Sequence, residues 1–313
     1  MARILTVAAA QLGPIQREHT REQAVARMCT LMREAKKHGT DLVVFPECAL
    51  TAFFPHWYFE RQEDIDAFFE REMPNAATQP LFDLARELRI GFYLGYAELA
   101  MSSEGDARHF NTSILVDAEG RIVGKYRKIH LPGHYDHRPA NAFQNLEKRY
   151  FDVGDLGFSV WRAFGGIVGM AICNDRRWSE TYRVMGLQGV EMILLGYNTP
   201  VHNPPAPEHD NLGLFHNALV MQSGAYQNAT WVIGVAKAGD EGGVRQLGGS
   251  MIVAPSGEIV AQATTEGDEL IVARCDLDLC NSYKRTTFNF AAHRRTEHYR
   301  MIVERAGATP PKE

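Results

Sequence analysis

The sequence predicts a single α/β domain, residues 1–313, in which two similar halves pack their sheets together with helices outside. Short apolar runs alternate with segments of helical periodicity, which is typical of layered α/β folds. An internal repeat is also present: SILVDAEGRIV (113–123) and SMIVAPSGEIV (250–260) align without a gap and share five of eleven residues. Each copy reads as two strands joined by a turn centred on Gly. No stretch rich in Gly, Ser or Pro separates two domains.

The first half supplies three strands and two helices in order. The apolar run 4–12 predicts an opening strand. Residues 21–39 keep apolar side chains on one helical face and end on Gly, so they predict a helix. Residues 41–45 form a buried strand by composition, 80–89 a second helix and 91–99 a third strand.

The second half repeats this alternation. Residues 178–189 and 212–228 have helical periodicity, and the apolar runs 191–197 and 230–238 predict strands. The tail from about residue 280 is expected to lie outside the core, where it is available for a contact between subunits.

Composition excludes several classes of function. The net charge is −5, and the single basic cluster, 125–128, is too short for a nucleic-acid footprint. No run approaches the ~18 apolar residues that span a bilayer. The five cysteines are scattered without a C-x-x-C pair, which indicates free thiols in a reducing cytoplasm. We therefore expect a cytoplasmic protein whose partner is a small molecule.

Cys173 is the first candidate for chemistry. It ends a run of small and aliphatic residues, GGIVGMAIC, and the polar stretch NDRRW follows it. Ligand sites of α/β folds lie at the carboxyl ends of strands, and nearby cations favour the nucleophilic thiolate. A plain core thiol is the common alternative, and we accept that alternative for the other four cysteines.

Two further polar residues leave predicted strands in the same way. Glu47, in VVFPECAL, follows a buried strand and has apolar neighbours. Burial disfavours an ionised carboxylate, which suits a general base that works near neutral pH. Lys128, in GKYRKIHLPG, enters the loop after the first hairpin, whereas Lys125 and Arg127 fit a solvated strand edge.

A thiol, a carboxylate and an ammonium at strand exits are the set that acyl transfer requires. The trio resembles the Glu-Lys-Cys signature of the nitrilase (carbon–nitrogen hydrolase) superfamily, and the similarity runs from AAAQLGP to FNFAAHR. The stretches FNTSILVD, GKYRKIHLPGH, LEKRYF, CNDRRW, GYNTP and HNPP are similar to its N-carbamoyl-D-amino-acid amidohydrolase branch. The resemblance implies a nitrilase-like αββα four-layer sandwich with an internal pseudo-twofold repeat, no cofactor, no metal, and a homodimer or homotetramer.

The resemblance also implies roles for individual residues. Cys173 is expected to be the nucleophile, Glu47 the general base and Lys128 the cation that stabilises the oxyanion and the leaving group. Glu147 matches a second glutamate of the family, and the backbone N–H of Asn174 would complete the oxyanion hole.

The sequence departs from that branch at one position near the expected pocket. Asn145 stands where the branch has His, so substrate preference is expected to differ there.

The residues after Cys173 are expected to bind substrate. A guanidinium binds a carboxylate through two parallel hydrogen bonds, which Lys cannot do. We expect one of Arg176 and Arg177 to hold the α-carboxylate of the substrate and the other to pair with the protein, and the resemblance favours Arg176 for the carboxylate. Asn198 and Thr199 are expected to offer hydrogen bonds to the ureido group.

The histidines allow two alternative readings. His130, His134 and His137 resemble a metal cluster, but a Pro-Gly pair breaks the helix that would align the first two. We expect His130, two residues after the lysine, to support the substrate site instead. A papain-like Cys–His mechanism with His216 or His130 as base leaves the Glu and Lys placements unexplained.

The function predicted from the sequence is hydrolysis of the carbamoyl group of an N-carbamoyl-D-amino acid. An aliphatic amidase or a nitrilase is the alternative enzyme, but a substrate without a carboxylate would leave a clamp arginine unpaired. A catalytically inactive binding scaffold is the alternative of a different class, and the intact trio argues against it.

Overall fold

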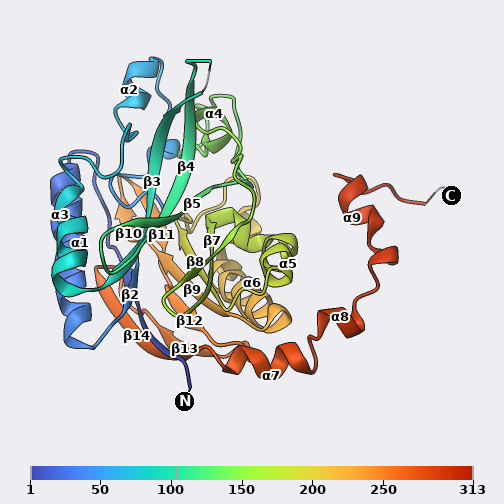
Figure 1. Cartoon of the computed structure of the whole chain (residues 1–313). Coiled ribbons are helices and arrows are strands. Elements are labelled where there is room, and N and C mark those ends of the chain that lie inside the picture. The colour runs from blue at the N-terminus through green and yellow to red at the C-terminus, as the bar shows by residue number, and fades with distance from the viewer. Residues whose placement is uncertain (1, 103, 312–313) are drawn as a thin grey trace.

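The computed structural model describes residues 2–102 and 104–311, and two six-stranded mixed sheets form its centre (Figure 1). The strands of the first sheet are Ile4–Gln11 (β1), Leu42–Val44 (β2), Gly91–Met101 (β3), Ala107–Val116 (β4), Ile122–Arg127 (β5) and Glu269–Asp276 (β14). Those of the second are Val160–Ala163 (β6), Gly166–Ile172 (β7), Met192–Tyr197 (β8), Trp231–Ala236 (β9), Met251–Val253 (β12) and Ile259–Gln262 (β13).

The two sheets have the same topology. Their strand orders are β14-β1-β2-β3-β4-β5 and, read in the matching direction, β6-β7-β8-β9-β12-β13. In each sheet three parallel strands are followed by an antiparallel hairpin, and one antiparallel strand closes the other edge. The repeated sequences 113–123 and 250–260 form the two equivalent hairpins, so the predicted internal repeat is confirmed.

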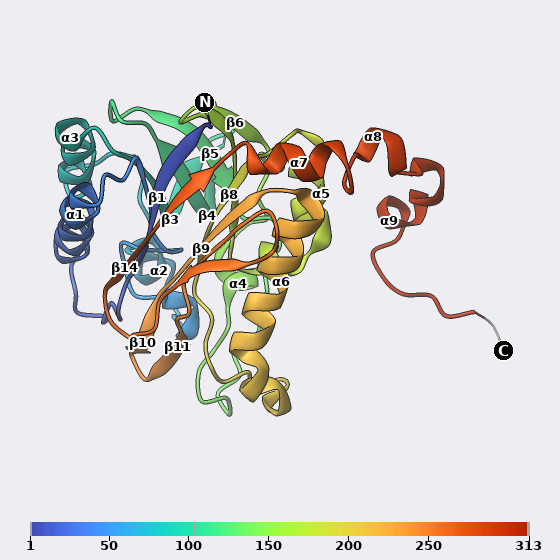
Figure 2. The ribbon, with the colours of Figure 1, turned by 90° about the horizontal axis from the view of Figure 1, so that it is seen from below.

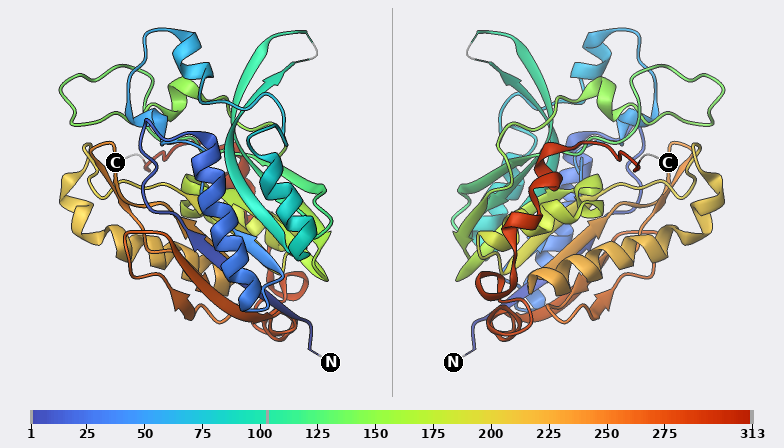
Figure 3. Two further views of the ribbon diagram at one scale, coloured as in Figure 1. Left: turned by 90° about the vertical axis from the view of Figure 1, so that its left-hand side faces the viewer. Right: turned by 90° about the vertical axis from the view of Figure 1, so that its right-hand side faces the viewer.

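Helices cover the outer face of each sheet. Arg21–Lys37 (α1) and Gln79–Leu88 (α3) lie on the first sheet, and Ser179–Leu187 (α5) and Gly213–Asn228 (α6) lie on the second (Figures 2 and 3). Thr20 caps α1, since its side chain accepts the Gln23 N–H while the Gln23 side chain accepts the Thr20 N–H. The predicted αββα sandwich is therefore confirmed.

The inner faces of the two sheets share one hydrophobic core. Val7 and Tyr93 of the first sheet belong to the same buried cluster as Met170, Leu194 and Val232 of the second. Each large aliphatic side chain buried in this way contributes about 1.5–3 kcal/mol relative to its exposed state. The strands are apolar on both faces because the sheets pack against each other and against the helices.

Several elements were not predicted. They are the strands Ala238–Glu241 (β10) and Val244–Leu247 (β11), the edge strands β6 and β14, the short helices Gln62–Asp66 (α2) and Glu147–Tyr150 (α4), and the 3₁₀ turns Phe54–His56 (η1), Cys173–Arg177 (η2), Pro207–Leu212 (η3) and Thr296–His298 (η4). The single helical turns and the four-residue strands β6, β10 and β11 are too short to carry a clear periodicity. β14 is eight residues long and contains the apolar run LIVA, a signal that was missed.

The C-terminal segment begins with Leu279–Arg285 (α7), which still packs on the sandwich through the buried Cys280, so the tail leaves the core a few residues later than predicted. Beyond α7 the chain continues as an arm with Phe290–His293 (α8) and Arg300–Glu304 (α9) (Figure 1), where the apolar residues Met301, Ile302 and Val303 are exposed. This placement leaves the arm available to a second copy of the chain, so the expected oligomer contact stays a prediction. None of the helices in the described ranges has the length and apolar character that crossing a membrane requires.

Candidate active site

Polar side chains from both sheets meet where the strands end. Glu47 follows β2, Lys128 directly follows β5, Cys173 directly follows β7 and Asn198 directly follows β8. Glu147 joins them from the start of α4. The structure thus brings together the four residues that were predicted from the sequence to be catalytic: Glu47, Lys128, Glu147 and Cys173.

Lys128 lies between two buried carboxylates. Its Nζ donates to Glu47 Oε1 at 2.7 Å and to Glu147 Oε2 at 2.5 Å, and the three side chains are at most 2% exposed. Burial by itself lowers the pKa of Lys128, but Cys173 in its thiolate form and the carboxylates of Glu147 and Glu47 raise it well above its usual value. An ammonium has three donors, so one N–H remains for a substrate oxygen.

For the pKa of Glu147, the effect of burial outweighs that of the neighbouring charge. Burial is the largest influence and raises its pKa to about 7, although Lys128 works against that rise. Its Oε2 accepts a hydrogen bond from Lys128, and the residue also lines the cavity.

Two glycines allow the Glu47 backbone to lie between the sheets. A Cβ on Gly95 of β3 would come within 2.8 Å of Glu47 Cα, and a Cβ on Gly196 of β8 within 2.5 Å of Glu47 N. The Glu47 carboxylate then accepts hydrogen bonds from Asn111 Nδ2 at 2.7 Å and from the Asn198 N–H at 2.8 Å. Asn111 was not predicted from the sequence. The feature that could have revealed it is the polar asparagine in FNTS, within a strand that continues into the apolar run ILV.

Cys173 has an unusual backbone and a protonated thiol. Its φ of 47° lies in the left-handed region, which a residue with a Cβ enters at a cost and which is frequent at functional sites. Burial is the main reason that its pKa is raised; Glu47 adds to the rise, and Lys128 and Arg176 oppose it. The thiol donates to the Asn198 carbonyl at 3.2 Å, so attack requires a base to remove its proton.

Asp175 organises the turn after Cys173, a role that the sequence reading missed. Its buried carboxylate accepts from the Tyr126 hydroxyl at 2.8 Å and from the Ile172 N–H at 3.0 Å. It also accepts from the His130 N–H at 3.0 Å and lies 2.8 Å from His130 Nδ1. The aspartate in CNDRRW is the feature of the sequence that could have revealed this role.

His130 binds Asp175 and stacks on Trp178. It thereby supports the turn that carries Cys173, in line with the supporting role expected from the sequence. A direct contact between His130 and substrate stays a prediction.

Asn174 is the second residue of the 3₁₀ turn η2, whose first backbone N–H groups have no partner inside the turn. Its side chain donates to the His130 carbonyl at 3.1 Å. The oxyanion role proposed for its N–H depends on this position directly after Cys173.

The preference for Arg176 as carboxylate clamp was wrong. Arg176 is 1% exposed and its guanidinium is occupied within the protein. It donates to Asn217 Oδ1 at 3.0 Å, to the Cys173 carbonyl at 2.6 Å and to Thr199 Oγ1 at 2.9 Å. Its carbon Cζ also lies 4.3 Å from the centre of the Tyr197 ring. Arg176 therefore holds the nucleophile turn.

Arg177 has the contacts expected of a free clamp. It lines the cavity and forms no salt bridge with any described carboxylate; its one hydrogen bond is to Asn174 Oδ1 at 3.2 Å. The side chain is exposed to solvent at the mouth of the cavity, and the neighbouring Arg176 is the first reason that its pKa is lowered, to about 10. The guanidinium stays charged at neutral pH, and no carboxylate of the described residues pairs with it.

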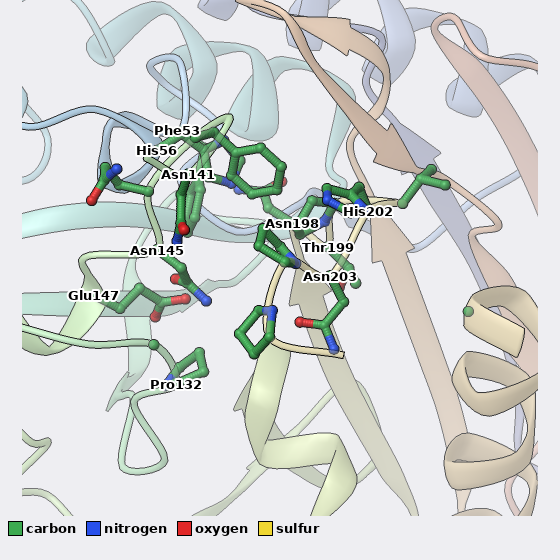
Figure 4. Close-up of a pocket in the computed structure, with 18 of the residues that line it drawn as sticks. Phe53, His56, Pro132, Asn141, Asn145, Glu147, Asn198, Thr199, His202 and Asn203 are labelled. Carbon is green, nitrogen blue, oxygen red and sulfur yellow. The ribbon is translucent and has the colours of Figure 1, made fainter. Parts of the chain in front are cut away.

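The cavity beside these residues has a volume of about 430 Å³. Figure 4 shows Glu147, Asn145, Asn198 and Thr199 on its wall, with Phe53 and His56 nearby. Phe143 and Val201 add apolar surface. A cavity of this kind accommodates a small substrate with one polar end and one apolar end.

The histidines of IHLPGHYDH point to separate partners. His130 contacts Asp175, His134 Nδ1 lies 2.7 Å from the Asp136 carbonyl, and His137 stacks on Tyr58. Across residues 2–102 and 104–311, no group of three or more His, Cys, Asp or Glu is arranged to hold a metal ion.

His56 gives a testable pH dependence. It is 2% exposed, its Nδ1 has no partner among the described residues, and its pKa is lowered to about 3, first by burial and then by Lys237. The folded protein therefore binds fewer protons than the unfolded chain between pH 6.5 and 3. Stability contributed by neutral His56 is present above pH 6.5 and is lost by about 1.4 kcal/mol per unit as pH falls.

His56→Phe is expected to make the melting temperature depend less on pH between pH 6.5 and 4.5. His298→Phe, at a side chain that is 76% exposed, is the matched control and should follow the wild type. A His56→Phe profile parallel to the wild type would show that His56 becomes protonated in the folded state.

Comparison with known proteins defines the class of this chain. The carbon–nitrogen hydrolase family profile matches residues 6–285, so the chain belongs to the carbon–nitrogen hydrolase family.

Named relatives cover nearly the whole chain. N-carbamoylputrescine amidase of Arabidopsis thaliana is 31% identical over 90% of this chain and 91% of its own length. Citrullinase of Francisella tularensis is 28% identical over 90% and 93%. A carbon–nitrogen hydrolase structure from Helicobacter pylori superposes with a TM-score of 0.82 at 23% identity, over 97% of this chain and 99% of that one.

Proposed function

We propose that this carbon–nitrogen hydrolase removes the carbamoyl group from N-carbamoyl amino acids, with a preference for the D-isomers. The observation that carries the proposal is Arg177: its guanidinium lines the same cavity as Cys173, Glu147 and Thr199 and forms no salt bridge with a carboxylate of residues 2–102 or 104–311. A substrate carboxylate would supply the missing anion.

The proposed chemistry begins at the ureido carbon. Glu47 takes the proton of the Cys173 thiol, and the sulfur adds to the carbon. The third N–H of Lys128 and the N–H of Asn174 stabilise the oxyanion. Glu47 returns the thiol proton to the departing nitrogen, which leaves as ammonia or as the amino acid, and a thiocarbamate remains on sulfur. Water activated by Glu47 then hydrolyses this intermediate. One water and one substrate yield amino acid, ammonia and carbon dioxide.

Several polar groups would orient the ureido group. Glu147 Oε1 can accept one of its N–H groups. Thr199 Oγ1 accepts from Arg176, so its own hydroxyl proton is available to the ureido oxygen.

The comparisons support the ureido part of the proposal at a coarser level. The relatives named above include an N-carbamoylputrescine amidase and a citrullinase, whose names both refer to ureido compounds. The D-amino acid part is supported by CNDRRW, GYNTP and HNPP, which resemble the D-specific branch. All five cysteines are unpaired, which supports the proposed cytoplasmic location.

Arg177→Ala should discriminate between substrates with and without a carboxylate. A charged hydrogen bond is worth about 1.5–3 kcal/mol, so kcat/KM for N-carbamoyl-D-alanine should fall about 10- to 100-fold. The loss for the corresponding amide should be small, because the amide carries no anion for Arg177. Arg177→Lys should recover little, since an ammonium does not reproduce the planar fork.

Arg176→Ala is the comparison variant. Because Arg176 holds the nucleophile turn, its removal should lower activity on both compounds equally. An Arg177→Ala variant with equal losses on both compounds would contradict the carboxylate clamp and favour a plain amidase.

A further inference from the structure

A second buried ion pair lies apart from Lys128. Lys237 and Glu241 are both 0% exposed, and Lys237 Nζ is 3.2 Å from Glu241 Oε2 and 3.3 Å from Oε1. The proposed chemistry uses neither residue. A buried ion pair is costly unless hydrogen bonds satisfy its remaining donors and acceptors, so its other contacts indicate its role.

Those contacts all go to backbone groups outside strands and helices. Lys237 Nζ donates to the Thr51 carbonyl at 2.6 Å. Glu241 accepts the Phe53 N–H on Oε1 at 2.5 Å and the Ile15 N–H on Oε2 at 2.9 Å. Buried backbone groups require a partner, and here the ion pair supplies three of them.

The segment held in this way forms one wall of the cavity. Residues 51–56 follow Glu47 by four residues, and Phe53 and His56 line the cavity. The positive charge of Lys237 also contributes, after burial, to the low pKa of His56. The charged pair therefore lies close behind this wall.

Backbone hydrogen bonds continue from the wall to Glu147. The His56 carbonyl accepts the Gln144 N–H at 2.9 Å, and the Pro55 carbonyl accepts the Leu146 N–H at 2.9 Å. Leu146 directly precedes Glu147, which binds Lys128.

We propose that Lys237 and Glu241 are positioning residues that hold the wall 51–56 against the substrate and, through it, the segment that carries Glu147. The pair would set how well a substrate side chain fits beside Phe53 and His56. This inference rests on the proposed function for the identity of the substrate, but not for the contacts that it describes.

The test compares Glu241→Gln with Glu191→Gln as matched control. Glu191 is 7% exposed and pairs with Arg3 at 2.6 Å, but it precedes β8, six residues before the strand end at Tyr197. In Glu241→Gln, amide hydrogen exchange in peptides covering 50–58 and 140–150 should be about tenfold faster than in the control. KM for N-carbamoyl-D-phenylalanine should rise about 10- to 100-fold, and that for N-carbamoylglycine should change little.

The double variant Lys237→Met/Glu241→Met separates positioning from charge balance. It removes both charges but leaves the backbone groups of Thr51, Phe53 and Ile15 without partners, so fast exchange should persist. Exchange at wild-type rates in Glu241→Gln or in the double variant, or equal losses on both substrates, would overturn the inference. If the wild type hydrolyses neither substrate, the proposed function fails, and hydrogen exchange still decides the positioning role.

Discussion

Cys173→Ala is expected to fold and to lose turnover by about 10⁴- to 10⁶-fold, as removal of a covalent nucleophile does. Among the described residues the thiol has two hydrogen-bond partners, the Asn198 carbonyl and, at 3.7 Å, Arg176, and alanine keeps the Cβ that packs in the core. The measurement is ammonia release by purified, folded variant. Cys173→Ser should lose almost as much turnover, because Glu47 must then deprotonate a hydroxyl, which is a far weaker acid than a thiol.

Cys280→Ala is the matched control. Cys280 is also fully buried, and its thiol also donates to a carbonyl, that of Glu191 at 3.4 Å. Its replacement should lower stability and leave kcat intact. Near-normal turnover by Cys173→Ala would remove the nucleophile from the account.

Lys128→Met is expected to have the second largest effect, on both stability and activity. It leaves Glu47 and Glu147 facing each other in the interior without a cation. Breaking a buried ion pair costs about 3–5 kcal/mol, and urea unfolding should show a loss of this size. The loss should be larger at pH 8 than at pH 6, because uncompensated carboxylates escape the penalty by binding protons.

Lys125→Met provides the comparison. Lys125 binds Glu98 at 2.7 Å but is 38% exposed, and such pairs contribute at most about 1 kcal/mol. If Lys128→Met were as stable as Lys125→Met, the buried charge cluster would not exist as described.

Much of the fold could be predicted because local patterns of apolar residues mark its helices and strands. The helix 21–39 and the strand 4–12 are marked by periodicity that tertiary contacts reinforce. The repeated hairpins predicted two equivalent halves, and the structure places them at equivalent edges. Strand-end placement also nominated Glu47, Lys128 and Cys173, since parallel strands bring their carboxyl ends to one edge.

The misassigned arginine shows what local patterns leave open. Two adjacent arginines point in different directions, but the sequence does not indicate which one faces the interior. That choice is made by Asn217 and Thr199, which lie 41 and 23 residues beyond Arg176 and satisfy its guanidinium. The same reason hid Asp175, whose partner Tyr126 comes from the other sheet.

The most direct test of the account is ammonia release from four compounds by the wild-type protein: N-carbamoyl-D-phenylalanine, its L-isomer, a simple aliphatic amide and a nitrile. We predict rapid release from the D-compound, slower release from the L-isomer and little from the other two. Faster release from the amide or the nitrile than from either carbamoyl compound would contradict it, because the unpaired Arg177 would then have no role in recognising substrate.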